Sequence, residues 1–244
     1  MPGKPRQYSE SGYMHLTVRG NGKQILFEED SDYFCYIHLM KKFSLETHVV
    51  ICAYCLMENH VHMLVYDSEK KVSVFMRKLD VSYAGYYNRK YDRNGHLFQG
   101  RFGSKAINDE NYLLTVFRYI LNNPRKAGIC DAASYPWSSY NHYGNPGSFV
   151  DTKIIQELLG DRKEYEEFIA AKYEDEPELE EKKHDDTWAL EIILEDLQVE
   201  SGTQLQSYTS EKRKAAIQLL KEKGLSVRQI ERLTGINRNT IQRA

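Results

Sequence analysis

The chain has 244 residues, 41% of them hydrophobic, so it can bury one sizeable core, or one core and a smaller module. No stretch approaches the roughly 18 consecutive apolar residues that a membrane-spanning helix needs, and the first residues lack the apolar core of a signal peptide. The net charge of −2 does not by itself indicate an anionic partner. We therefore expect a cytoplasmic protein with no membrane partner.

The first half of the chain alternates between strand and helix patterns. Asp30 is a candidate cap for the first helix, and the second and third strands are expected to form a hairpin in the middle of a sheet. In chain order the patterns predict a strand at 12–19, a helix at 28–46, strands at 49–57 and 60–66, a helix at 70–90, a strand at 104–107 and a helix at 109–122.

The first six of these elements follow the order of a ferredoxin-like α+β fold. In that fold an antiparallel sheet carries its helices on one face and leaves the other face free for a site. Val74, Leu79, Val81 and Tyr86 are expected to face the core from the second helix.

Two histidines stand on one side of the strand at 60–66. Side chains alternate along a strand, so His60 and His62 project together while Val61 and Met63 project the other way. They are either a pair on a solvated face or two neutral imidazole ligands of one divalent ion. Cys52 and Cys55 face opposite ways on their strand, so a zinc site is not expected there.

The helix at 109–122 is capped by Asp109 and stopped by Pro124. Tyr119 and Asn123 are four residues apart and so share one face, which the helical spacing places opposite the apolar arc. The arc that we expect to be buried consists of Leu113, Leu114, Phe117, Ile120 and Leu121.

Basic and aromatic residues interleave in the first half of the chain, a pattern that suits single-stranded nucleic acid. We predict DNA contacts from Arg19, Asn21, Asn88, Arg89, Arg93, Arg101 and Arg118. Residues 1–128 carry a charge of +5, residues 129–200 carry −13 and residues 201–244 carry +6. Two basic blocks flanking an acidic one are expected when both ends touch a polyanion.

The last residues follow a helix-turn-helix pattern. A helix at 210–223 precedes one at 227–233, a turn at 234–236, and a last helix that Asn237 caps. Arg238, Asn239, Gln242 and Arg243 would then reach phosphates or base edges of duplex DNA. The expected division is 1–145 for a catalytic domain, 146–200 for a helical acidic connector, with short helices within 151–173 and an acidic run at 174–186, and 201–244 for the helix-turn-helix module.

Four motifs in the first 145 residues together resemble the single-tyrosine HUH transposases, most closely the REP-associated tyrosine transposases. They are the sequences AYCLMENHVHMLV, YYNRKYDRNGHLFQGRF, YLLTVFRYILNNPRKAG and YPWSSY. The resemblance implies a metal-dependent endonuclease and strand transferase for single-stranded DNA, often at hairpins. It implies that Tyr119 is the nucleophile and that His60, His62 and Asn123 are the metal ligands.

A phenol is a poor nucleophile at neutral pH, so a cation should polarise the phosphate, and an open site of two imidazoles and an amide suits Mg²⁺ or Mn²⁺. Attack by Tyr119 would leave a 5′-phosphotyrosine and a 3′-OH, and rejoining would need no ATP. In this family the tyrosine helix serves its own subunit or a partner's, so the protein is a monomer or a homodimer.

Several alternatives stay open at this point. Tyr119 could be a core residue, with Tyr83, Tyr86 or Tyr112 as the nucleophile, and Glu58 could support a metal ligand from outside. One rival function is a non-catalytic regulator that binds duplex DNA through the helix-turn-helix. Another is a nicking enzyme of the replication-initiator or relaxase type.

Overall fold

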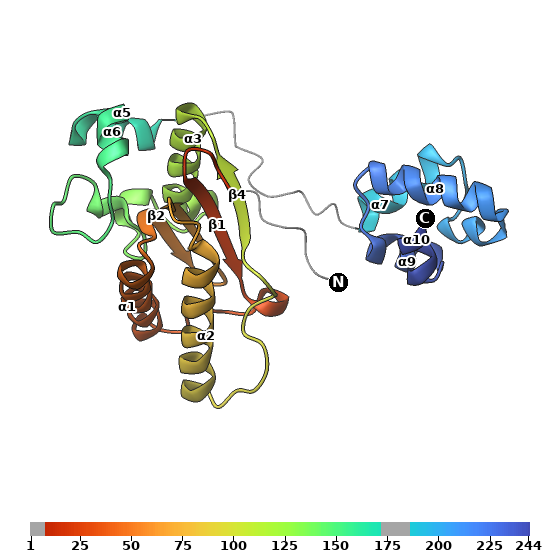
Figure 1. The fold of residues 1–244 in the computed structure, drawn as a ribbon, viewed down its shortest axis with the longest axis horizontal. Coiled ribbons are helices and arrows are strands. Elements are labelled where there is room, and N and C mark those ends of the chain that lie inside the picture. Colours follow the sequence, from red (N-terminus) through yellow and green to blue (C-terminus); the bar gives the residue numbers. More distant parts are fainter. Residues whose placement is uncertain (1–7, 172–185) are drawn as a thin grey trace. The chain divides into compact units, whose positions relative to one another are not determined.

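The computed structural model describes residues 8–171 and 186–244, in two compact units, Met1–Leu179 and Glu180–Ala244 (Figure 1). This differs from the three predicted segments, because α5 (Lys153–Leu159) and α6 (Arg162–Ala170) pack onto the first unit. Tyr165 of α6 is fully buried there, with its ring 4.0 Å from that of Tyr143. Of the predicted acidic run 174–186, all but Asp186 lies outside the described residues.

A four-stranded antiparallel sheet forms the centre of the first unit. Its strands are β1 (Tyr13–Arg19), β2 (Val50–Met57), β3 (His60–Tyr66) and β4 (Gly103–Ile107), in the order β2-β3-β1-β4. The α+β prediction and the ferredoxin-like βαββαβ order are confirmed. The β2–β3 hairpin is not in the middle of the sheet, because β2 is an edge strand. Of its two strands only β3 is internal.

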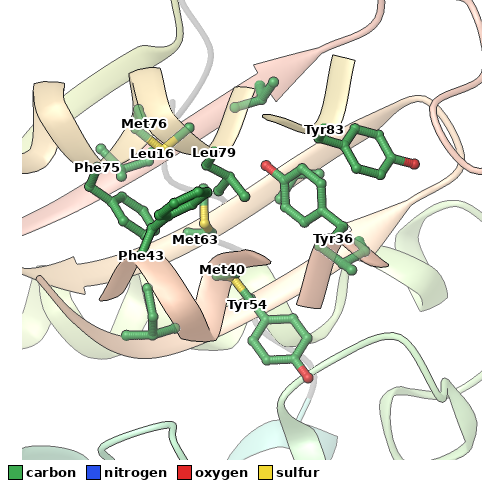
Figure 2. Packing of buried hydrophobic residues seen from close by; sticks show 14 of the residues in the cluster. Leu16, Tyr36, Met40, Phe43, Tyr54, Met63, Phe75, Met76, Leu79 and Tyr83 are labelled. Carbon is green, nitrogen blue, oxygen red and sulfur yellow. The ribbon is translucent and has the colours of Figure 1, made fainter. Parts of the chain in front are cut away.

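Two long helices, α1 (Asp30–Thr47) and α2 (Val72–Lys90), cover one face of the sheet (Figure 1). Their apolar side chains interdigitate over Leu16 and Met63 of the sheet, as Figure 2 shows for Met40, Phe43, Phe75, Met76 and Leu79. The prediction that Val81 faces this core is wrong. Val81 is 68% exposed, whereas Leu79 is fully buried as predicted, together with Met76 and Tyr83.

The opposite face of the sheet is not free, contrary to the expectation from the sequence. α3 (Glu110–Leu121) and the short α4 (Asn123–Lys126) cover it. This face of the sheet carries the apolar side chains of Ala53, Cys55 and Leu64, which pack with Leu113, Phe117 and Ile120 of α3. Asp109 caps α3 as predicted, by accepting a hydrogen bond from the Tyr112 amide at 2.7 Å, and Pro124 stands at the start of α4.

The ends of α1 and α2 meet at a buried carboxylate. The cap of α1 is Glu29 and not Asp30, and Asp32 completes the capping box with it. Asp32 is fully buried and accepts hydrogen bonds from Lys90 Nζ and the Tyr91 hydroxyl, both at 2.6 Å, and from two backbone amides. Burial opposes ionisation of Asp32, but these bonds outweigh it and lower the pKa of the carboxyl.

We expect Asp32→Ala to lower the free energy of unfolding by about 3–5 kcal/mol, because the Tyr91 hydroxyl and two backbone amides lose their acceptor and Lys90 keeps only Glu29 and Ser31. Since the folded-state pKa is lowered, this stabilisation is present above the pKa of an unfolded aspartate and is lost as pH falls through the folded value. Urea unfolding followed by near-ultraviolet circular dichroism measures it. The control Asp30→Ala, at an exposed position two residues away, should stay within about 0.5 kcal/mol. An equal loss in both variants would contradict the account.

The second unit is helical. Ile193, Leu205, Ile217, Leu220 and Ile230 form its buried core. Its helices are α7 (Asp186–Asp196), α8 (Ser210–Glu222), α9 (Val227–Thr234) and α10 (Arg238–Arg243). Short 3-10 helices complete the chain: η1 (Asn21–Lys23), η2 (Ala132–Ser134), η3 (Tyr140–His142) and η4 (Gly202–Ser207). Within the described ranges no helix is both long and apolar enough to cross a bilayer.

Candidate active site

His60 and His62 lie on the face of β3 that α3 covers. Arg19 and Thr17 of β1 are their partners in the ladder, so the pair stands beside the end of a second strand. The two rings meet edge to face with centres 5.1 Å apart. His62 is fully buried and His60 is partly exposed, so the two histidines are not a pair on a solvated surface.

Tyr119 and Asn123 approach these histidines from the helices. Asn123 Oδ1 lies 3.5 Å from His60 Nε2, and the centre of the Tyr119 ring lies 5.3 Å from that of His62. Asn123 Nδ2 donates to the Tyr119 carbonyl at 3.0 Å, which leaves Oδ1 as the atom that faces the histidine. One chain therefore brings together all four residues that the sequence singled out.

The surroundings of Tyr119 and Asn123 differ from those predicted. Both side chains are only 6% exposed, because the Tyr119 ring lies against His15 and His62 of the sheet and Asn123 lies beside His60, not in solvent. The Tyr119 ring is packed against two imidazoles, since the His15 ring is 6.2 Å away in addition to that of His62. The phenol thus lies among polar rings at the site.

Each histidine of the pair has a partner at its Nδ1 atom. His60 Nδ1 is 2.8 Å from Asn59 Oδ1, and His62 Nδ1 is 3.0 Å from His15 Nε2. Glu58, the residue considered for such support, is exposed. Sequence reasoning missed both partners. Asn59 is adjacent to His60, but His15 reaches His62 only through the pairing of β1 with β3.

Both buried histidines are neutral at physiological pH. Burial, with the nearby Lys105 charge, lowers the pKa of His15 to about 4. Burial, the neighbouring histidines and the Arg19 and Lys126 charges hold the pKa of His62 well below its usual value. Neutral imidazole is the form that ligates metals.

The donor atoms fit a divalent ion. His62 Nε2 is buried and has no hydrogen-bond partner, which is costly unless something else fills the site. Two ligands of a Mg²⁺ ion at 2.0–2.1 Å lie at most about 4.2 Å apart, so the 3.5 Å between His60 Nε2 and Asn123 Oδ1 is compatible with a shared ion. The described residues contain no group of three His, Cys, Asp or Glu side chains suited to a metal. An ion held by His60 and His62 would therefore need the Asn123 amide as its third protein donor.

The cysteines take no part in this set. All four are free thiols, and burial raises the pKa of Cys52 and Cys55, which makes thiolate ligands unfavourable there.

Lys126 is a further cation at the site that the sequence reasoning did not single out. Its Nζ atom lies 5.2 Å from the centre of the Tyr119 ring. Lys126 follows Tyr119 by seven residues, close to two helical turns, and this spacing is the signal that would have found it.

Most of the predicted DNA contacts gather at the end of β1, next to His60. The Gln99 amide donates to the Arg19 carbonyl and the Asn21 amide to the Leu97 carbonyl, so the turn after β1 is joined to the loop after α2. In this region Asn88 donates to the Gly95 carbonyl at 3.1 Å and Arg93 to Gln24 at 2.7 Å. The exposed members are Arg19, Asn21, Arg89, Arg93 and Arg101.

Other predicted residues lie elsewhere. Arg118 packs its guanidinium 3.6 Å above the Phe168 ring of α6, which gives it a packing contact inside the unit. Tyr83 and Tyr86 belong to the α1–α2 face of the sheet, so they are remote from the histidines. Tyr112 lies about two turns before Tyr119 on α3. Arg238, Asn239 and Arg243 are exposed on α10 of the second unit.

Comparisons with known proteins identify the family and support the fold. Residues 8–123, which include His60, His62, Tyr119 and Asn123, match the family model described as "Transposase IS200 like". A solved structure of a REP-associated tyrosine transposase bound to a REP hairpin is similar at 20% identity and a TM-score of 0.51, over 58% of this chain and 84% of that chain. It supports the fold.

A candidate transposase from Deinococcus radiodurans R1 aligns at 18% identity and a TM-score of 0.35, over 49% of this chain and 96% of that one. No curated protein matches the chain.

Proposed function

Because residues 8–123 form a domain of the IS200-like transposase family, we propose that the chain cleaves and rejoins single-stranded DNA through a phosphotyrosine intermediate. One observation carries the proposal. A phenol, a carboxamide oxygen and two imidazoles converge between β3 and the helices α3 and α4, with 3.5 Å between Asn123 and His60 and 5.3 Å between the ring centres of Tyr119 and His62.

The Tyr119 hydroxyl oxygen would attack phosphorus in line with the bond to the 3′ oxygen. The phenol loses its proton, the P–O3′ bond breaks, and the departing 3′ oxygen takes up a proton to become a hydroxyl. The 5′ phosphate then remains esterified to Tyr119. A 3′-OH from the same or another strand reverses these steps, and no external energy is needed because the phosphodiester is exchanged for a phosphotyrosine ester.

His60, His62 and Asn123 would hold Mg²⁺ or Mn²⁺. When bound, such an ion supplies Lewis-acid polarisation of the phosphate and neutralises its developing charge. The residues of the chain contribute the rest. The Asn123 amide donates to the backbone carbonyl of Tyr119, and Lys126 adds a positive charge beside the Tyr119 ring.

The substrate is proposed to be single-stranded DNA beside a hairpin. The exposed arginines described above, Arg19, Arg89, Arg93 and Arg101, supply the positive charge that a phosphate backbone needs. Arg19 is the ladder partner of His60, which is partly exposed. The hairpin follows from the similar transposase, whose structure holds a REP hairpin.

The test uses a hairpin oligonucleotide with single-stranded flanks, labelled at its 3′ end, and the full chain with Mn²⁺. A 5′-phosphotyrosine link retains the 3′ label on the protein in a denaturing gel. When an unlabelled strand with a free 3′-OH is added, the labelled segment should leave the protein and appear joined to that strand as a longer DNA. Nicking without joining would favour the replication-initiator type of enzyme, and binding without an adduct would favour a regulator.

The geometry of α9 and α10 supports a second activity, the binding of duplex DNA. α9 and α10 are joined by a tight turn in which Gly235 has a φ of +70°, and Ser226 and Asn237 cap the two helices with their side chains. We propose that this pair is a helix-turn-helix for duplex DNA, with exposed Arg238, Asn239 and Arg243 on its second helix.

We expect the double variant Arg238→Ala and Arg243→Ala to weaken duplex binding and to reduce the slope of log K against log salt by about 0.9 for each phosphate that is no longer neutralised. Covalent attachment to the hairpin strand should be unchanged. Fluorescence anisotropy at several salt concentrations measures the slope. An unaltered slope would mean that α10 does not touch DNA. The control is Lys214→Ala, at an exposed position on α8 outside this helix pair, which should leave the slope unchanged.

A further inference from the structure

The contact between His15 and His62 decides which way the proton of His62 points. His15 lies on β1, two residues from Thr17, the partner of His62 in the ladder, and its ring is nearly parallel to that of His62, with 9° between the planes and 5.1 Å between the ring centres. His15 Nε2 and His62 Nδ1 are 3.0 Å apart, and both side chains are buried. At this distance one nitrogen must donate and the other accept.

Only one of the two proton arrangements leaves His62 Nε2 able to bind a metal ion. If His15 donated, His62 Nδ1 would accept and the N–H of His62 would sit on Nε2. That atom is buried without an acceptor. If His62 Nδ1 donates, Nε2 carries a lone pair instead, and a lone pair is what a metal ion requires.

The neighbouring histidine is arranged in the same way. His60 Nδ1 faces Asn59 Oδ1 at 2.8 Å, and because a carboxamide oxygen can only accept, the N–H of His60 is on Nδ1. Its Nε2 is then also a lone pair, aimed at the side where Asn123 Oδ1 lies. The Nδ1 atoms of the two histidines therefore have different partners, the Asn59 amide for His60 and the His15 imidazole for His62.

We propose that His15 is a positioning residue that fixes the proton of His62 on Nδ1 and keeps the Nε2 lone pair directed into the site. The role requires His15 to be the Nδ1–H tautomer, with Nε2 as the acceptor. This inference rests on the proposed metal site. It concerns a residue that the sequence motifs do not include, 47 positions before His62.

A packing role alone makes a different prediction. Leucine would fill much of the volume of His15 but cannot accept a hydrogen bond. Glutamine can place an amide oxygen near the position of His15 Nε2. A role in packing therefore tolerates His15→Leu, whereas a role in orienting His62 tolerates His15→Gln.

The experiment measures the ring nitrogens of His62 by nitrogen-15 NMR in the metal-free full chain at neutral pH. The unchanged protein should show a protonated Nδ1 and an unprotonated Nε2. His15→Gln should keep this pattern, and His15→Leu should shift it toward a protonated Nε2. Mn²⁺ affinity, measured by electron paramagnetic resonance, should fall about 10–100-fold in His15→Leu and stay within about threefold in His15→Gln.

His38→Leu is the control for the loss of a histidine, since His38 is exposed on α1, beyond the other face of the sheet. A protonated Nε2 on His62 in the unchanged protein would overturn the proposal, and so would an unchanged pattern in His15→Leu. If His15→Leu fails to fold, the spectrum of the unchanged protein still decides. A chain with the expected tautomer but no DNA adduct would contradict the proposed function and leave this inference standing.

Discussion

Tyr119→Phe is expected to abolish the covalent adduct with single-stranded DNA and to reduce cleavage by at least about 10³-fold. The substitution removes only the hydroxyl, while the ring keeps its contacts with His62 and His15. The fold and the metal ligands therefore stay in place, and the loss reports on the nucleophile. Denaturing gels of labelled oligonucleotide measure both the adduct and the released strand.

Tyr112→Phe is the matched control, because Tyr112 is on the same helix, two turns earlier. It should retain activity within about twofold. An adduct that persists in Tyr119→Phe would show that another side chain attacks the phosphate, and Tyr112 would then be the first to test.

Removing the metal or a metal ligand should have the next largest effect. We expect His62→Ala to lose about 10²–10³-fold in cleavage, since several kcal/mol of charge stabilisation would go with the ion. Chelation with EDTA should stop the unchanged protein, and added Mn²⁺ or Mg²⁺ should restore it. Calorimetric titration with Mn²⁺ should show that His62→Ala has lost the site.

The control is His96→Ala, at an exposed position in the loop after α2. It should leave both Mn²⁺ binding and cleavage unchanged. Full activity in the presence of EDTA would contradict a role for a metal, and an unchanged titration of His62→Ala would place the ion elsewhere.

Two local periodicities paired the candidate site residues in the sequence, and the resemblance to the single-tyrosine HUH transposases supplied their expected roles. Alternation along β3 put His60 and His62 on one side, and the four-residue spacing put Tyr119 and Asn123 on one face of a helix. The structure brings the two pairs together as expected.

The direction in which Tyr119 faces could not be predicted from the same periodicity. An apolar arc on a helix indicates one buried side, but α3 is buried on two. The sheet covers one side, and α6 covers another, where Phe168 receives Arg118. Which polar residues lie inside then depends on packing between distant segments, and the same holds for His15.

The interval between Tyr119 and Asn123 has a consequence for how the chain can vary in length. Each added residue turns a helix by about 100°, so one insertion between the two positions would swing the amide a quarter-turn or more away from His60. We expect substitutions at exposed positions of α3 to be tolerated, but not insertions or deletions between Tyr119 and Asn123. Length variation among relatives should therefore collect in surface segments such as 144–148, and never between these two residues.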